Sequence, residues 1–139
     1  AHGLNARHLE LEITEGTMMQ DIAAAVRCTT RLKEIGVRIA LDDFGTGYSS
    51  LSYLHRFPLH ALKIDRSFVR ELSSAHEGGS AAVVRAVLAL ANTLGLEVVA
   101  EGIETEAQRA ILLELGCERG QGFLFSRARC AQEWQAAHA

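Results

Sequence analysis

One stretch decides the fold: Val37-Arg38-Ile39-Ala40-Leu41-Asp42-Asp43-Phe44-Gly45-Thr46-Gly47-Tyr48-Ser49-Ser50. Its first half predicts a buried strand, because large apolar residues alternate from Val37 to Leu41. The strand runs directly into two adjacent carboxylates, Asp42 and Asp43, and then into a loop of Gly, Thr and Ser. Neighbouring carboxylates repel each other and are costly to desolvate without a cation or donors. A solvated acidic pair at a strand end is the alternative for an isolated case, so recurrence of the pattern decides between the two.

Length and composition indicate one domain with a sizeable core. The chain has 139 residues, of which 48% are hydrophobic. Its net charge is −3, with acidic and basic residues interspersed, which argues against binding DNA or RNA through phosphate neutralisation. The three cysteines, Cys28, Cys117 and Cys130, are far apart and lack metal-site spacing. We therefore expect reduced thiols in a cytoplasmic protein.

We expect no membrane or targeting segment in this sequence. Its most apolar run, residues 81–96, is interrupted by Arg85 and Asn92, and its beginning does not have the pattern expected of a signal peptide. The chain begins with Ala-His-Gly and not with Met, which suggests a fragment of something longer. A cytoplasmic domain of this kind can still belong to a parent anchored to the membrane through other domains.

Strand patterns alternate with helix patterns along the whole chain. We expect strands over residues 9–15, 37–42, 61–65, 98–100 and 120–125, and helices over residues 21–35, 51–57, 66–72, 80–94, 105–115 and 130–139. Ser50 and Ser80 are expected as N-caps, and Gly36, Gly95 and Gly116 as the residues that end helices.

This order of elements predicts an α/β fold. Strands and helices that alternate with short connections favour parallel strands joined by right-handed crossovers. The chain holds about four and a half βα units, whereas a closed (β/α)₈ barrel typically needs roughly 250 residues. We predict the C-terminal part of a TIM-like (β/α)₈ barrel, with about five strands and their helices; a small open α/β sheet is the alternative.

Acidic residues recur where the predicted strands end. They are Glu12, Asp42 with Asp43, Asp65 and Glu101. The carboxyl ends of parallel strands meet at one edge, where such folds bind ligands. Converging carboxylates repel one another without a cation, and oxygen-only ligands suit Mg²⁺ or Mn²⁺ better than zinc. The sequence therefore predicts a site for a hard divalent cation at this edge.

Two further polar residues belong to the predicted site. Lys63 shares a strand face with Asp65, so it can neutralise the acids or orient and deprotonate a metal-bound water. Gln121 lies between two glycines, a setting that is by itself typical of a loop. The six histidines form no pair at metal-site spacing.

The motifs together resemble the EAL domain family, which comprises bacterial cyclic di-GMP phosphodiesterases. The matching segments are residues 9–15 (LELEITE), 42–51 (DDFGTGYSSL), 62–69 (LKIDRSFV), 99–105 (VAEGIET) and 121–123 (QGF). The resemblance implies a modified TIM barrel with one antiparallel strand, and hydrolysis of cyclic di-GMP to linear pGpG. It also implies that residues 1–139 are a single partial EAL domain lacking the N-terminal strands of the barrel.

The resemblance assigns roles to individual residues. The implied metal ligands of a two-metal site are Glu12, Asp42, Asp43 and Glu101, with Asp42 bridging the metals. Lys63 matches the lysine that handles the attacking water, and Glu101 is a further catalytic acid.

Two more positions have supporting roles by resemblance. Gln121 matches a glutamine that lines the site, and Glu15 matches the acid that anchors the loop of residues 43–51. In the family this loop couples dimerisation to metal binding.

The resemblance also implies partners. The ligand is cyclic di-GMP, the parent forms a homodimer through the barrel, and other signalling domains accompany it. The signature glutamate and a metal-binding asparagine of the family precede this sequence, so the metal shell is incomplete and the 139-residue chain alone is expected to be inactive. Residues 126–130 replace the usual proline-containing segment, which changes how the last helix docks.

Two other functions remain open at this point. One is a non-catalytic EAL module that binds cyclic di-GMP or another protein; retention of Lys63, Asp42, Asp43 and Glu101 argues against it. The other is an enolase-like barrel that uses strand-end acids and lysines on a carboxylate substrate, which leaves the Asp-Asp-Phe-Gly-Thr-Gly loop unexplained.

Overall fold

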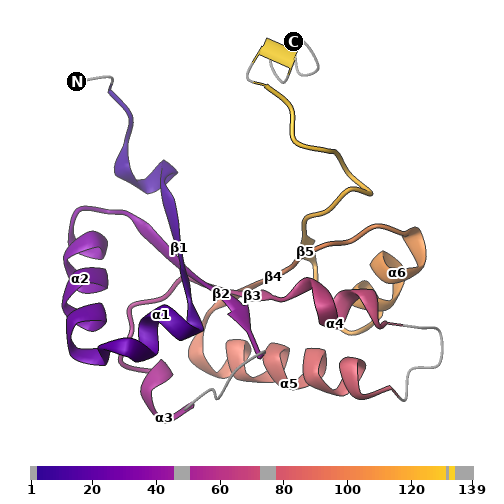
Figure 1. The fold of residues 1–139 in the computed structure, drawn as a ribbon, viewed down its shortest axis with the longest axis horizontal. Coiled ribbons are helices and arrows are strands. Elements are labelled where there is room, and N and C mark those ends of the chain that lie inside the picture. Colours follow the sequence, from indigo (N-terminus) through magenta and orange to yellow (C-terminus); the bar gives the residue numbers. More distant parts are fainter. Residues whose placement is uncertain (1–2, 46–50, 73–77, 131, 134–139) are drawn as a thin grey trace.

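A single parallel sheet organises the molecule. The structure is a computed structural model that describes residues 3–45, 51–72, 78–130 and 132–133. Its strands are β1 (Glu10–Thr14), β2 (Arg38–Phe44), β3 (Ala61–Ile64), β4 (Glu97–Ala100) and β5 (Arg119–Gly120). Every neighbouring pair is parallel, and the strands lie in the order β1-β2-β3-β4-β5 (Figure 1).

This strand order decides between the two predicted architectures. A doubly wound open sheet reverses its strand order at a switch point, whereas here the order in space follows the chain throughout. Figure 1 shows the α-helices gathered along one side of the sheet, with η1 and the segment that follows β5 on the other. The arrangement is part of a TIM-like barrel, as the sequence predicted.

In the described part of the chain, seven helices connect or flank the strands. They are the 3₁₀ helix η1 (Ala6–His8) and the α-helices α1 (Glu15–Gln20), α2 (Ile22–Glu34), α3 (Leu51–Leu54), α4 (Arg66–Arg70), α5 (Gly79–Leu94) and α6 (Glu106–Glu114). Among the described residues, none of these helices is long and apolar enough to cross a membrane.

The core lies between the sheet and these helices. Alternate residues of the central strands are fully buried there, including Ile39, Leu41, Leu62 and Ile64. The intervening residues face the other side of the sheet, which we call the concave face by analogy with a barrel interior. Polar residues gather on this concave face.

Several predicted helix ends are confirmed. The Asp21 side chain accepts a hydrogen bond from the Ala24 amide at 2.9 Å and caps α2. The helix expected from residue 105 begins there, where Thr105 and Gln108 form a capping box at the start of α6. Gly95 ends α5 with a φ of +67°, a left-handed conformation that an L-residue with a side chain adopts at a cost.

Other predicted elements were wrong. The strand expected over residues 120–125 is only Arg119–Gly120, because the chain turns at once after Gln121 and packs back on Ile103. Ser80 does not cap α5: the cap is Gly78, and the Ser80 hydroxyl donates to Glu71 at 2.6 Å.

The first strand also differs from expectation. It ends at Thr14, which caps the unpredicted helix α1. Leu9 and Leu11 are exposed, because β1 is an edge strand in the described part of the chain. The Ser50 cap and most of the helix expected over residues 130–139 lie outside the described residues.

Candidate active site

Strand register brings the predicted residues together on the concave face. Glu12 comes from β1, Asp42 from β2 and Lys63 from β3, while Glu101 follows the end of β4. The Lys63 ammonium lies 2.6 Å from Glu12 Oε1 and 3.7 Å from Asp42 Oδ1, and it forms an ion pair with Glu101 Oε1. Three acids from three strands therefore surround one lysine.

Two alanines make this convergence possible. Glu12 pairs in register with Ala40 of β2, and Ala40 pairs with Ala61 of β3. The methyl side chains of Ala40 and Ala61 leave space above the concave face, so the long Lys63 side chain can extend across β2 to Glu12. Lys63 itself is only 5% exposed, which makes its charge expensive without the surrounding carboxylates.

The surroundings set the charge state of Lys63. Burial by itself would lower the pKa of Lys63, but the bonds to Glu101 and Glu12 and the field of Asp42 outweigh it and raise the pKa. Among these carboxylates, Lys63 is therefore protonated at neutral pH.

Asp43 reaches the acidic group through an irregular backbone. Strict alternation after Asp42 would turn it toward the helices, but the pairing of β2 with β3 shifts register between Leu41 and Phe44. Asp43 has a φ of +55°, a conformation that Asp and Asn tolerate better than most residues. Burial, followed by repulsion from Asp42 and Asp65, raises the pKa of the Asp43 carboxyl.

Asp65 has a structural role. Its carboxylate accepts a hydrogen bond from the Ser67 amide at 2.9 Å and caps α4. Burial would raise the pKa of Asp65, but the hydrogen bonds from Ser67 and the Arg66 amide lower it. Asp65 thus lies at the predicted strand end, and its carboxylate is engaged in the helix cap.

Gln121 joins the site from the segment after β5. Its Nε2 donates to Glu101 Oε1 at 2.8 Å, the same oxygen that pairs with Lys63. The Gln121 backbone amide donates to Ala100 at 2.8 Å, which ties this segment to the end of β4.

Glu15, the first residue of α1, is buried. Its side chain is 6% exposed, and neither carboxylate oxygen has a hydrogen-bond partner in the described part of the chain. The segment that it is expected to anchor includes residues 46–50, which lie outside the described ranges. A buried, unsatisfied carboxylate costs folding free energy, so it points to a functional constraint.

The donor chemistry fits a hard divalent cation. Glu12, Asp42, Asp43 and Glu101 offer only carboxylate oxygens, which are the preferred ligands of Mg²⁺ and Mn²⁺. No group of three or more His, Cys, Asp or Glu residues in the described ranges is arranged to hold an ion. The Lys63 ammonium lies between the acids instead, so a metal site requires additional ligands or a shift of this lysine.

A recess opens beside this cluster. It has a volume of about 480 Å³ and is lined by Asp65, Arg66, Ser67, Arg70, Gly102 and Glu104. Two guanidinium groups and two carboxylates thus border the strand ends that carry Lys63 and Glu101.

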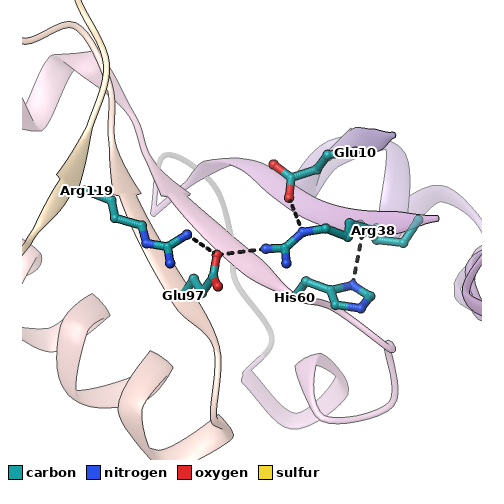
Figure 2. Close-up of polar contacts among 6 residues, drawn as sticks. Glu10, Arg38, His60, Glu97 and Arg119 are labelled. Atoms are coloured by element: carbon teal, nitrogen blue, oxygen red, sulfur yellow. Dashed lines mark hydrogen bonds and ion pairs between the residues drawn. The ribbon is translucent and has the colours of Figure 1, made fainter. Parts of the chain in front are cut away.

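A second polar layer crosses the sheet where the strands begin. Arg38 Nε donates to Glu10 at 3.0 Å, and Arg38 Nη2 donates to Glu97 at 2.7 Å. The same Glu97 oxygen accepts from Arg119 at 2.6 Å (Figure 2). The bond to Glu10 is the main reason that the pKa of Arg38 is raised. This chain of charges connects β1, β2, β4 and β5.

This layer was not predicted from the sequence, although its signal was present there. Glu10 lies two residues before Glu12, and Glu97 lies four residues before Glu101, so each pair shares one face of a strand. Arg38 and Asp42 are related in the same way. Period-two alternation therefore predicts two polar layers on the concave face.

A comparison with protein families identifies a match over most of the chain. The sequence profile described as EAL domain matches residues 1–128. Among known proteins, the chain is 51% identical over 136 residues to MucR of Pseudomonas aeruginosa, named a bifunctional diguanylate cyclase/cyclic di-GMP phosphodiesterase. The match covers 98% of this chain and 20% of MucR, so the chain spans about a fifth of that relative.

Solved structures agree with this match. The MucR phosphodiesterase in complex with cyclic di-GMP superposes with a TM-score of 0.89 at 51% identity, covering 96% of this chain and 53% of that one. A manganese and cyclic di-GMP complex of Klebsiella pneumoniae BlrP1 superposes with a TM-score of 0.80 at 37% identity, covering 90% and 31%.

Proposed function

The chain belongs to the EAL domain family, and we propose that it is the C-terminal part of a domain that hydrolyses cyclic di-GMP to linear pGpG. The observation that carries this proposal is the convergence of Glu12, Asp42 and Glu101 on Lys63. The similarity to MucR, which is solved with cyclic di-GMP, supports this choice of substrate.

We infer that residues 1–139 form one partial domain. The chain covers 53% of the solved MucR phosphodiesterase chain, and its β1 and β5 are edge strands among the described residues. The remaining barrel strands would pair with these edges and supply the metal ligands that are missing here. The whole parent would then carry the activity, and this chain alone would not.

Each residue of the site has a proposed role. Glu12, Asp42, Asp43 and Glu101 would hold two divalent cations. Such cations supply a lowered pKa for bound water and neutralise charge on the transferring phosphoryl group. Lys63 would offset the carboxylates that it contacts and orient the attacking water.

Two residues support these groups. Gln121 holds Glu101 through its amide, which fixes the carboxylate that Lys63 contacts. Glu15, buried without a partner in the described ranges, would accept donors from the loop that follows Asp43. The recess between α4 and Gly102 offers room beside the cluster for part of a nucleotide.

We propose Mg²⁺ or Mn²⁺ as the cofactor. Both prefer carboxylate oxygens, and the BlrP1 complex contains manganese together with cyclic di-GMP. We further propose that the parent is cytoplasmic at this domain and forms a homodimer through the barrel. We also propose that it carries other signalling domains, as the bifunctional name of MucR suggests for that relative.

The proposal is tested by measuring pGpG release from cyclic di-GMP by the full-length protein with Mg²⁺ or Mn²⁺. Lys63→Met should lower kcat by about 100-fold or more, as loss of one preorganised charge does in other enzymes. Lys33→Met, which removes an exposed lysine at the end of α2, is the control and should leave kcat unchanged.

The same assay separates the alternatives. The isolated 139-residue chain should release no pGpG, and robust turnover by it would contradict the partial-domain proposal. A full-length protein that binds cyclic di-GMP but never cleaves it would instead be a non-catalytic receptor.

A further inference from the structure

Gly120 and Gly122 flank Gln121, and both lie against Ile103. A Cβ on Gly122 would lie 2.3 Å from the Ile103 amide nitrogen and 2.2 Å from its carbonyl oxygen. A Cβ on Gly120 would lie 2.3 Å from Ile103 Cδ1. Real Cβ atoms do not approach other atoms so closely, so a side chain at residue 122 would displace the Ile103 backbone, and one at residue 120 would displace the end of the Ile103 side chain.

Hydrogen bonds lock the same segment in place. Ile103 donates its amide to the Gln121 carbonyl at 3.1 Å, and Leu124 donates to the Ile103 carbonyl at 3.0 Å. Ile103 is itself 3% exposed and belongs to the core. The Gln121 backbone is therefore fixed relative to the core through one buried residue.

The Gln121 side chain depends on this placement. Gln121 is exposed, so packing does not hold its side chain; within the described part of the chain, the side chain bonds to Glu101 at 2.8 Å. That Glu101 oxygen also pairs with Lys63. A displacement of the Gln121 backbone would remove the amide from Glu101 and change how the carboxylate meets the lysine.

We propose that Gly120 and Gly122 are positioning residues for catalysis. Because neither has a side chain, Ile103 packs against the backbone on each side of Gln121, and this packing holds the Gln121 amide on the Glu101 carboxylate. The inference rests on the proposed phosphodiesterase function for its kinetic consequence. The geometric claim about Gln121 stands apart from that function and has its own test.

The kinetic test is a double-mutant cycle in the full-length protein. Gly120→Ala should lower kcat by about 10- to 100-fold, as a displacement near 1 Å does, with a smaller change in KM. If Gly120 acts through Gln121, then Gly120→Ala should lower kcat little further in a Gln121→Ala background. Additive effects on kcat, or unchanged kcat in Gly120→Ala, would overturn the proposal.

A size exchange tests the contact itself. Ile103→Val removes the Cδ1 atom that a Cβ at residue 120 would meet, so Ile103→Val should restore most of the kcat lost in Gly120→Ala. Gly122→Ala meets backbone atoms and should not be rescued. The control is Gly79→Ala, where a Cβ has nothing within 4 Å and no positive φ is required. Failure of Ile103→Val to rescue Gly120→Ala would contradict the proposed contact.

A spectroscopic readout distinguishes this inference from the proposed function. The NMR signal of the Gln121 side-chain amide should move toward that of a free glutamine in Gly120→Ala and return in Gly120→Ala/Ile103→Val. This holds even if the wild-type protein cleaves no cyclic di-GMP, a result that would reject the proposed function alone. An amide signal that is the same in wild type and Gly120→Ala would reject the positioning role.

Discussion

At the scale of the residue, Asp43 shows how the site strains the fold around it. Its carboxyl is crowded by Asp42 and Asp65, and its backbone takes a φ of +55°. Burial and this repulsion raise its pKa above the ordinary value of 3.8. The folded state therefore binds a proton more readily than the unfolded chain, and the associated stability is lost as pH rises through the raised pKa.

Asp43→Asn should consequently stabilise the metal-free protein at neutral pH. Asparagine removes the charge and tolerates the left-handed backbone as well as aspartate does. We expect a gain of about 1 kcal/mol, seen as a rise of a few degrees in Tm without divalent cations, together with loss of pGpG release. Asp21→Asn, which keeps the helix cap of α2, is the matched control. A lower Tm for Asp43→Asn would contradict this account of the crowded carboxylates.

At the scale of the element, the strands were predictable and their ends were not. Alternation in residues 37–42 and 61–65 located β2 and β3, and one face of each carries the predicted acids and lysine. The short β5 was overestimated, because apolar residues such as Phe123 suggest a strand when they follow a turn. The local sequence pattern does not show that the chain after Gln121 bonds to the Ile103 backbone instead of continuing the strand.

His60 shows a second contact that pattern could not reveal. Its Nδ1 accepts a hydrogen bond from the Ile39 amide at 3.1 Å, just before β3 begins (Figure 2). Burial, followed by the nearby charges of Arg38 and Lys33, lowers the pKa of His60. The neutral imidazole thus accepts a hydrogen bond from a β2 amide just ahead of the pairing between β2 and β3.

His60→Ala should destabilise the domain by about 1–3 kcal/mol at pH 8, because the buried Ile39 amide loses its acceptor. Since the folded pKa lies below the unfolded value of 6.5, this stability is present above pH 6.5 and is lost as pH falls through the folded pKa. Denaturant unfolding at pH 8 and pH 5 should show the difference from wild type shrinking. His55→Ala removes an exposed histidine and should have little effect; an equal loss at both pH values would contradict the role of His60.

At the scale of the whole molecule, the fold class followed from the rhythm of strands and helices. Five parallel strands in chain order form part of a TIM-like barrel, as the alternation of strand and helix patterns predicted. The site was foreseeable to the extent that strand ends converge, which placed Glu12, Asp42, Lys63 and Glu101 correctly in one cluster. The capping role of Asp65 was not foreseeable, because it depends on where α4 begins.

The two polar layers of the concave face differ in their balance of charge. The layer of Arg38, Glu10, Glu97 and Arg119 pairs its charges internally where the strands begin. At the other end of the strands, three acids share one lysine, which leaves an excess of negative charge. Of these two layers, the one around Lys63 therefore has unbalanced charge among the described residues for a cation to neutralise.

The most direct test of the central claim is Mn²⁺ binding to the full-length protein, followed by electron paramagnetic resonance. The account predicts bound Mn²⁺ in the wild type and at least about tenfold weaker binding in Asp42→Asn, which removes one charged ligand. Glu97→Gln, in the layer where the strands begin, should bind Mn²⁺ as the wild type does. Equal Mn²⁺ affinity in wild type and Asp42→Asn would contradict the claim that the acids around Lys63 are the metal centre.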